Sequence, residues 1–508
     1  MHDLKKINSV LLAAVLTFAT TASPAVAAPA AASSSPQAWT YWKSDASALN
    51  VQGCATEVAK FHDGADVAFL FRSPSDAACA QAVNALQTGP AEVVMFKQEA
   101  METDVVGSVR GSSWKERALE ALSVQLQEST AEVASGQMAF QLSIAPQSAP
   151  QILSAHDSSL LVAVTDRSLS TIDMHATFDT RLERLFFRPI ATLGDDDIEK
   201  PEPTFKKPKY NSVVAKIASS SALNPARIVK DLRILTAEDP QPRDPGKWYS
   251  RHSATYGARL AGAWIKQQLE QSLAPLNGSS CDYFEYSPYF APNIVCHIPA
   301  VAAAGNEEGE VVVSAHYDSR GTFGSTTAPG GDDDGSGTAA LLAIARSLGS
   351  SQLAFASPIQ LVAFSGEEQG LVGSQHYATH LRTLESSHIK LALQMDMLAY
   401  RKPGEALQIA FPDKFVTNSA TQHVWRIADI YAPELEQGYT PACCSDHQSF
   451  WENGFPATWV FERNGPIADP MYHNSGDVTN RTGYDVQQLA SIAKVVTATL
   501  LDVAGFDA

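Results

Sequence analysis

The sequence predicts an α/β fold for its larger part, from about residue 211 to the C-terminus. Short apolar runs typical of buried strands alternate there with segments of helical periodicity. Arg259–Ser272 is amphipathic, and Ser336–Leu348 is a second helical segment with Ser336 as its expected N-cap. The clearest apolar runs are Val311–Ser314, Ile359–Phe364, Leu391–Met395 and Thr458–Phe461. This alternation predicts a sheet covered by helices, with polar groups at the carboxyl ends of its strands.

The composition is that of a folded, acidic protein. The chain has 508 residues, with 37 basic and 55 acidic side chains, a net charge of −18 and a pI near 5.1. Its length suggests two or three domains at roughly 150 residues each. Its 45% hydrophobic content excludes a disordered chain. The acidic balance argues against nucleic acid or an anionic membrane surface as a partner, and we expect a monomer.

The first 27 residues have the pattern of a signal peptide. Lys5 and Lys6 form a basic start, Leu11–Ala19 is mostly apolar, and Ala25–Ala27 fits a small-x-small cleavage site. The alternative is a short buried helix. No later stretch approaches the roughly 18 apolar residues that a membrane span needs. We therefore expect an exported protein, periplasmic or extracellular, in which disulfides are allowed.

Residues 28–192 are expected to form a smaller α+β domain. Val67–Phe71, Val93–Phe96 and Leu160–Val164 have the pattern of short strands, and Trp114–Gln127 has helical periodicity. Residues 193–210 combine three prolines with dense charge, which predicts a linker to the domain of residues 211–508. The smaller domain carries no catalytic cluster. Its position favours a prosegment that assists folding and masks a site on the larger domain, or else a permanent accessory domain.

The six cysteines fall into three local pairs. We favour the pairings Cys54–Cys79, Cys281–Cys296 and a vicinal Cys443–Cys444 bridge, with two reduced, buried thiols as the alternative for the last pair. The absence of a CxxC pair argues against a structural zinc held by cysteines.

Five segments place possible metal ligands just after predicted strands or in nearby loops. They are 316–318 (His-Tyr-Asp), 332–337 (Asp-Asp-Asp-Gly-Ser-Gly), 366–368 (Gly-Glu-Glu), 395–397 (Met-Asp-Met) and 472–473 (Tyr-His). Imidazole and carboxylate groups suit zinc with an open reactive position. Two ions also need a shared carboxylate and flanking ligands. Glu367 and Glu368 can divide two roles, one binding metal and the other serving as a base.

Longer stretches around these ligands resemble one known family. They are Ser-Ala-His-Tyr-Asp-Ser at 314–319, Ala-Pro-Gly-Gly-Asp-Asp-Asp-Gly-Ser-Gly at 328–337, Ser-Gly-Glu-Glu-Gln-Gly-Leu-Val-Gly-Ser at 365–374, Gln-Met-Asp-Met at 394–397, Cys-Ser-Asp-His at 444–447 and Met-Tyr-His-Asn-Ser-Gly-Asp at 471–477. In this order they resemble secreted di-zinc aminopeptidases of the bacterial leucyl aminopeptidase type. The resemblance implies the zinc-exopeptidase fold, with a mixed, mostly parallel central sheet flanked by helices.

The resemblance implies a role for each matching residue. The implied ligands of two zinc ions are His316, Asp333, Glu368, Asp396 and His473. Asp333 would bridge the ions, and its peptide bond to Asp334 would be strained or cis. Glu367 would be the general base and then the general acid. Asp318 would orient His316, and we extend that role to Asp477 with respect to His473.

The expected substrate is a peptide with a free N-terminus and an apolar first residue. We expect the pocket wall to contain Met397, Phe455 and Phe461, although each also suits an ordinary core. The resembled enzymes have a tyrosine where this chain has Ala442, and Tyr439 is the expected substitute. The alternatives are a glutaminyl cyclase or carboxypeptidase of the same family, or a receptor-like module without catalysis.

Overall fold

The computed structural model describes most of the chain from residue 202 onward and parts of the region before it. The described residues are 38–43, 56–63, 66–73, 92–102, 113–122, 151–155, 159–184, 202–243, 245–301, 309–325, 327–384 and 388–507. The expected signal peptide, residues 193–201 of the expected linker, and Cys54 and Cys79 lie outside these ranges.

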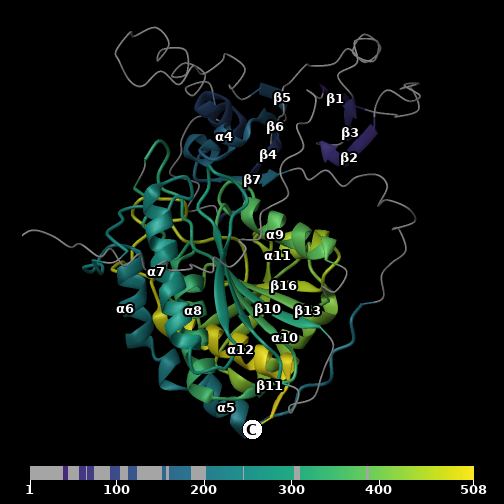
Figure 1. Cartoon of the computed structure of the whole chain (residues 1–508). Helices are drawn as coiled ribbons and strands as arrows, with labels where there is room; N and C mark the ends of the chain where they lie inside the picture. Colours follow the sequence, from purple (N-terminus) through teal and green to yellow (C-terminus); the bar gives the residue numbers. More distant parts are fainter. Residues whose placement is uncertain are drawn as a thin grey trace, which may run out of the picture. The chain divides into compact units, whose positions relative to one another are not determined.

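A six-stranded mixed sheet forms the centre of the C-terminal domain (Figure 1). Its strands, in spatial order, are β16 (Ala457–Val460), β13 (Ile389–Met395), β10 (Glu310–His316), β12 (Ile359–Phe364), β9 (Asn293–Ile298) and β8 (Ser280–Phe284). The four strands from β16 to β12 are parallel, and β9 and β8 pair antiparallel at one edge. The predicted α/β class is confirmed, and four parallel strands end at one edge of the sheet.

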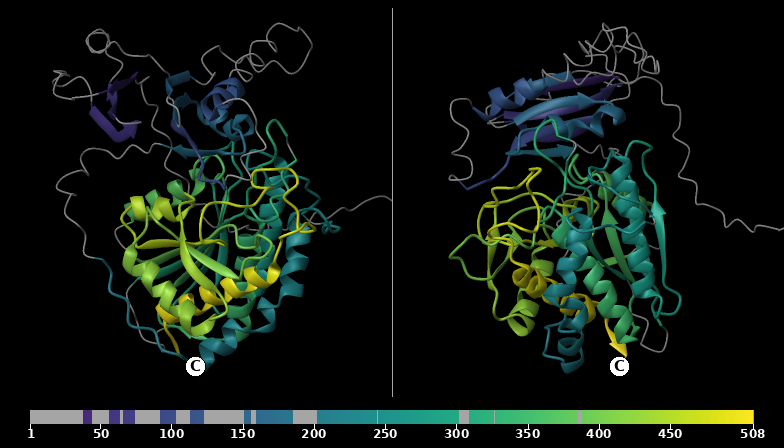
Figure 2. Two further views of the ribbon diagram at one scale, coloured as in Figure 1. Left: turned by 180° about the vertical axis from the view of Figure 1, so that it is seen from behind. Right: turned by 90° about the vertical axis from the view of Figure 1, so that its left-hand side faces the viewer.

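Helices cover both faces of this sheet, as Figure 2 shows from behind and from the side. Strand β10 explains why: Val311 and Val313 join the core on one face, and Val312 joins a separate core on the other. The first core includes α5 (Ser212–Ala218), η5 (Ser221–Leu223), α6 (Pro225–Leu235), α7 (Tyr256–Leu273), α8 (Gly335–Ser351), α10 (Asn418–Tyr431) and α12 (Val486–Ala504). The second core includes α9 (Val372–Thr383) and α11 (His447–Glu452).

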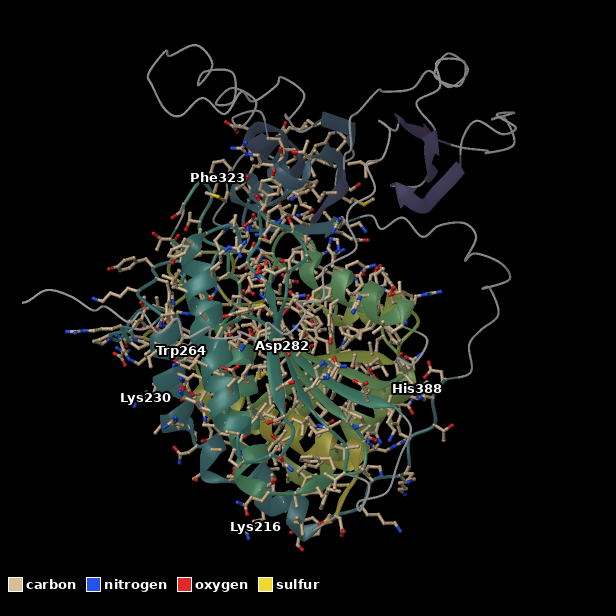
Figure 3. All side chains as sticks on the ribbon, in the orientation of Figure 1. Lys216, Lys230, Trp264, Asp282, Phe323 and His388 are labelled. Atoms are coloured by element: carbon tan, nitrogen blue, oxygen red, sulfur yellow. A yellow bond between two sulfur atoms is a disulfide. The ribbon has the colours of Figure 1, made fainter. Side chains whose placement is uncertain are left out.

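The outer helices are amphipathic. Helix α6 buries Ile228 and exposes Lys230, and α5 buries Val214 and exposes Lys216; both lysines are labelled in Figure 3. Two small sheets complete the domain, a parallel pair of β14 (Gln408–Pro412) and β15 (Glu436–Thr440) and an antiparallel pair of β11 (Ala354–Phe355) and β17 (Phe506–Asp507). In the part of the chain that is described, every helix is too short or too polar to cross a bilayer.

The start of α8 differs from the sequence prediction. The N-cap is Asp334 and not Ser336, because the Asp334 carboxylate accepts a hydrogen bond of 2.7 Å from the Gly337 amide. Ser336 lies inside the first turn, where its hydroxyl bonds the Asp332 carbonyl. The third aspartate of the acidic run therefore serves the helix, which affects the choice of metal ligands below.

The N-terminal region contains an antiparallel four-stranded sheet. Its spatial order is β5 (Gln151–Ala155), β6 (Ser159–Val164), β4 (Glu92–Gln98) and β7 (Thr180–Arg184). Residues 114–122 are helical, followed later by the short α4 (Asp166–Leu169) and η3 (Ile172–His175). A separate sheet has the order β1 (Ala38–Lys43), β3 (Asp66–Ser73), β2 (Thr56–Asp63). The strands predicted around residues 67, 93 and 160 are confirmed.

Residues 202–210 have no regular secondary structure, yet they are anchored to the C-terminal domain. The Glu202 carboxylate accepts hydrogen bonds from the amides of Asn418 and Ser419 at the start of α10. The ring of Phe205 stacks on His423 at 4.9 Å. This part of the expected linker is therefore held along the surface of α10.

Two of the favoured disulfides are present. Cys281 and Cys296 are register partners on β8 and β9, and a bridge joins them. Cys443 and Cys444 form the vicinal disulfide.

Candidate active site

The five predicted ligands converge at the carboxyl ends of the parallel strands. His316 is the last residue of β10, Glu368 follows β12, and Asp396 follows β13. Asp333 lies in the turn before α8, and His473 lies in the loop after β16. Because these strands are parallel and adjacent, side chains separated by up to 157 positions meet at one edge of the sheet.

Each histidine faces two carboxylates. His316 Nε2 lies 3.3 Å from Asp333 Oδ1 and 3.4 Å from Asp396 Oδ1. His473 Nε2 lies 3.4 Å from Asp333 Oδ2 and 3.2 Å from Glu368 Oε2. We call His316, Asp333 and Asp396 the His316 half-site, and His473, Asp333 and Glu368 the His473 half-site. The two oxygens of Asp333 thus face different half-sites, which is the arrangement of a bridging carboxylate.

The neighbouring Asp334 also lies within ligand distance of His316 and Asp396. Its oxygens are already engaged, however, since Oδ1 accepts from Gly337 and Met397 amides and Oδ2 accepts from the His316 amide. Asp334 therefore orders the backbone around the ligands, and Asp333 remains available to bind metal. The peptide bond between Asp333 and Asp334 is cis, as the resemblance implied.

The chemistry of the cluster fits bound cations. Both ring nitrogens of His316, Asp396 Oδ1 and Glu368 Oε1 are buried and have no hydrogen-bond partner. Burial raises the pKa of Glu368 to about 8, and burial together with Glu368 raises the pKa of Asp333 to about 6. Buried carboxylates crowded in this way are unfavourable as free anions, and divalent ions would neutralise them.

Glu367 lies beside the His316 half-site without completing it. Its Oε2 is 4.0 Å from His316 Nε2, and burial raises its pKa well above the usual range. Asp318 supports both residues. Its Oδ1 lies 3.5 Å from His316 Nδ1, and its two oxygens accept the backbone amides of Glu367 and Glu368 at 3.4 Å. Asp318 thus orders a ligand and the adjoining turn together.

The surroundings of His473 differ from the prediction. Asp477 does not orient this imidazole, because its carboxylate accepts the amides of Asp332 and Asp333 and pairs with Arg481. His473 Nδ1 instead lies 3.2 Å from the carbonyl oxygen of Phe178 in the smaller domain. Burial, with Arg320 beside the ring, lowers the pKa of His473 to about 3, which keeps the imidazole neutral.

A small cavity of about 30 Å³ adjoins the half-sites. Its walls include Met397 and Phe461, two of the residues expected to line the substrate pocket. They also include residues that were not expected there: Glu99, Ala442, Cys443, Cys444, Trp459, Ile467 and Tyr472. The structure places two other candidates elsewhere. Tyr439 is 56% exposed and packs on Trp425, and Phe455 packs on Phe450 under the opposite face of the sheet.

The comparisons with known proteins support the site. Residues 293–500 match the model described as Peptidase family M28, and this stretch contains all five ligands and Glu367. Over residues 293–500 the chain is thus similar to peptidase family M28.

Among curated proteins, "Leucine aminopeptidase 1" of Sclerotinia sclerotiorum is 30% identical over 253 residues, 46% of this chain and 62% of that protein. "Leucine aminopeptidase 1" of Leptosphaeria maculans is 30% identical over 254 residues, 47% of this chain and 62% of that protein. The chain spans 62% of the length of each of these relatives.

Two solved structures from Legionella pneumophila share the fold. The LapA aminopeptidase aligns with a TM-score of 0.57 at 18% identity, over 82% of this chain and 98% of that chain. LapB aligns with a TM-score of 0.58 at 18% identity, over 81% of this chain and 99% of that chain. The zinc-exopeptidase fold inferred from the sequence motifs is thereby confirmed. The aligned share is larger than the C-terminal domain alone.

Proposed function

We propose that the protein is an exported aminopeptidase that removes an apolar N-terminal residue from peptides with two bound zinc ions. The observation that supports this proposal most directly is the position of Asp333, whose two oxygens face the two histidines. Glu367 lies beside them and outside both half-sites. The M28 match and the curated leucine aminopeptidases support this chemistry. A cyclase, a carboxypeptidase or a non-catalytic module has no comparable support, because every ligand is retained.

The proposed ligands divide the two ions between the half-sites. His316 and Asp396 would hold one ion, His473 and Glu368 the other, and Asp333 would hold both. Zinc in such a pair supplies Lewis acidity toward a carbonyl and lowers the pKa of a bound water.

Glu367 would carry the proton transfers. Its raised pKa suits a group that accepts a proton from the attacking water near neutral pH and returns it to the leaving amine. Its backbone amide is bonded to Asp318, so the turn that carries this carboxylate is fixed relative to His316. That placement matters because a general base must lie within hydrogen-bond reach of the proton it removes.

The cavity walls would set the substrate preference. Met397, Phe461 and Trp459 are apolar and border the carboxylates that would attract an α-ammonium group. A cavity of about 30 Å³ has room for only one or two water molecules, so it would admit no more than a small part of a peptide in this conformation. The proposed export rests on the N-terminal sequence, and a monomer remains the expected state.

The test of the proposal is the Glu367→Gln variant. Glutamine keeps the size of the side chain and removes its basicity, so we expect kcat/KM on amino-acid p-nitroanilides to fall by about 10²–10⁴-fold. Metal analysis should find two zinc ions in both the parent and the variant. N-acetylated substrates serve as the matched control, since an aminopeptidase should not cleave them.

Two outcomes would contradict the proposal. If the variant with two zinc ions cleaves as fast as the parent, the role of Glu367 is wrong. If the purified parent binds no zinc, a binding module becomes the better reading.

A further inference from the structure

We infer that the smaller domain is a permanent part of the His473 half-site, in which Arg320 and the loop of residues 176–180 position the metal-binding imidazole. This inference rests on the proposed two-zinc site. It assigns Arg320 as a positioning residue, and it favours an accessory domain over a removable prosegment for residues 28–192.

The imidazole of His473 is fixed from two sides. Nε2 points to Asp333 and Glu368, so a metal there requires that Nδ1 carry the ring hydrogen. The acceptor for that hydrogen is the Phe178 carbonyl oxygen, 3.2 Å away. The ring of Tyr472 also stacks on the imidazole at 3.6 Å. Such a carbonyl partner fixes both the tautomer and the orientation of a ligating histidine.

Arg320 holds the loop that presents this carbonyl. Its Nη1 donates to the carbonyl oxygen of Thr180 at 3.0 Å, and its Nη2 donates to those of Ala176 and Thr177 at 2.6 and 2.9 Å. The same Nη1 lies 3.0 Å from His473 Nδ1, and because both nitrogens carry hydrogens in this tautomer, the contact is close packing and not a hydrogen bond. The planar guanidinium of arginine can donate hydrogen bonds to three carbonyl oxygens at once, which the single ammonium of lysine cannot do in the same geometry.

Further contacts keep the smaller domain in place around this loop. The buried Asp173 pairs with His252 at 3.0 Å, and Arg181 donates to the Cys443 carbonyl at 2.7 Å. The amide of Glu102 donates to the Ile467 carbonyl, and the Ile467 amide returns a bond to the Ala100 carbonyl. These contacts hold η3, β7 and the segment after β4 against the C-terminal region.

Removing the smaller domain would damage the half-site. Arg320 is 3% exposed, and its guanidinium would lose all three carbonyl acceptors while remaining beside a metal ligand. The Phe178 carbonyl would be lost as well, so no protein group would accept the hydrogen on His473 Nδ1 and fix the orientation of the ring. The domain therefore completes the site.

Two substitutions test the inference from opposite sides of the interface. Arg320→Lys keeps the charge and removes the planar guanidinium. Asp179→Ala changes only the smaller domain, where the Asp179 carboxylate accepts from Thr177 at 2.7 Å and from Arg117 and so shapes the loop. The matched controls are Arg346→Lys and Asp231→Ala, which alter a part-buried ion pair between α8 and α6. Arg346 lies roughly 16 Å along α8 from its first residue.

The readout is zinc affinity at each of the two sites, measured on the full-length protein by competition with a chromophoric chelator. We expect Arg320→Lys and Asp179→Ala each to lower the zinc affinity of one site by about 10–100-fold. The zinc affinity of the other site should stay unchanged. The zinc affinity of the double variant should be little lower than that of the single variant with the lower affinity, because both changes act through one loop. The control variants should bind both ions as the parent does.

Three results have distinct meanings. The inference is overturned if Arg320→Lys and Asp179→Ala both retain the parent affinity at both sites, or if the controls lose zinc to the same extent. Should Arg320→Lys fail to fold, Asp179→Ala decides alone. If the parent itself binds fewer than two zinc ions, the proposed function fails and the inference falls with it.

Discussion

In the His316 half-site the partners of the imidazole come from the central sheet and its turns, whereas one partner of His473 comes from the N-terminal region of the chain. Asp318, two residues after His316, faces its Nδ1, and Asp333 and Asp396 face its Nε2. The corresponding partner of His473 Nδ1 is the carbonyl of Phe178, 295 residues away.

This difference shows that two imidazoles in chemically similar surroundings can be positioned by different parts of the chain. Residues on adjacent parallel strands are positioned by sheet hydrogen bonds that form whenever the core folds. A ligand fixed by another domain is positioned only when that domain is docked. We therefore expect the His316 half-site to be the more robust of the two, and three experiments can challenge this comparison.

The largest expected effect comes from removing either imidazole. His316→Ala and His473→Ala should each lose one zinc ion, and kcat/KM should fall by more than about 100-fold because both ions are proposed to act together. Metal analysis beside kinetics measures both quantities. Retention of two tightly bound ions in either variant would remove that histidine from the ligand set.

A smaller effect is expected from Asp318→Asn. The asparagine keeps the shape but loses the charge that supports His316, so zinc in the His316 half-site should bind about 10–100-fold more weakly. Chelator competition measures the change. Asp231→Asn is the matched control. Asp231 is also buried and paired, but it lies on α6 and its partner is Arg346 on α8. Equal zinc loss in both variants would mean that Asp318 acts only through general stability.

The smallest effect concerns pH and the metal-free protein. Burial lowers the pKa of His473 to about 3, whereas at His316 Asp396 and Glu367 outweigh burial and raise the pKa well above its usual value. Burial also raises the pKa of Glu368 to about 8. Groups with raised pKa values bind protons more tightly in the folded state, so their contribution to stability declines as pH rises through those values.

The lowered pKa of His473 makes the folded state less stable as pH decreases, but only below the pKa of about 6.5 that this imidazole has in the unfolded chain. Between pH 6.5 and 8 we therefore expect the Tm of chelator-treated protein to fall by roughly 2–5 °C. The zinc-loaded protein should change little, because the ions replace those protons. Differential scanning calorimetry over this window checks the sign, and a rising Tm in the metal-free protein would contradict the assigned pKa shifts.

Much of the site was predictable because its residues follow strands. His316, Glu368 and Asp396 come directly after or at the end of apolar runs, and parallel strands bring their carboxyl ends together. The N-cap prediction was wrong because three consecutive aspartates offered several local alternatives and only the hydrogen bond to Gly337 selects Asp334. Tyr439 was proposed because it lies close to Ala442 in the sequence. In the structure it lies on β15, where its side chain is exposed and packs on Trp425.

The amino-acid sequence by itself determined the α/β class and placed imidazole and carboxylate groups just after strands, because strand periodicity and residue chemistry are local properties. The resemblance to a known family then implied which of these groups bind metal and that Glu367 stays free. Tertiary structure alone decided that Asp333 faces both histidines, that Glu99 lines the cavity, and that Arg320 joins the second domain to His473. These contacts depend on how separate cores pack, and no periodicity within either segment encodes which carbonyl will meet which imidazole.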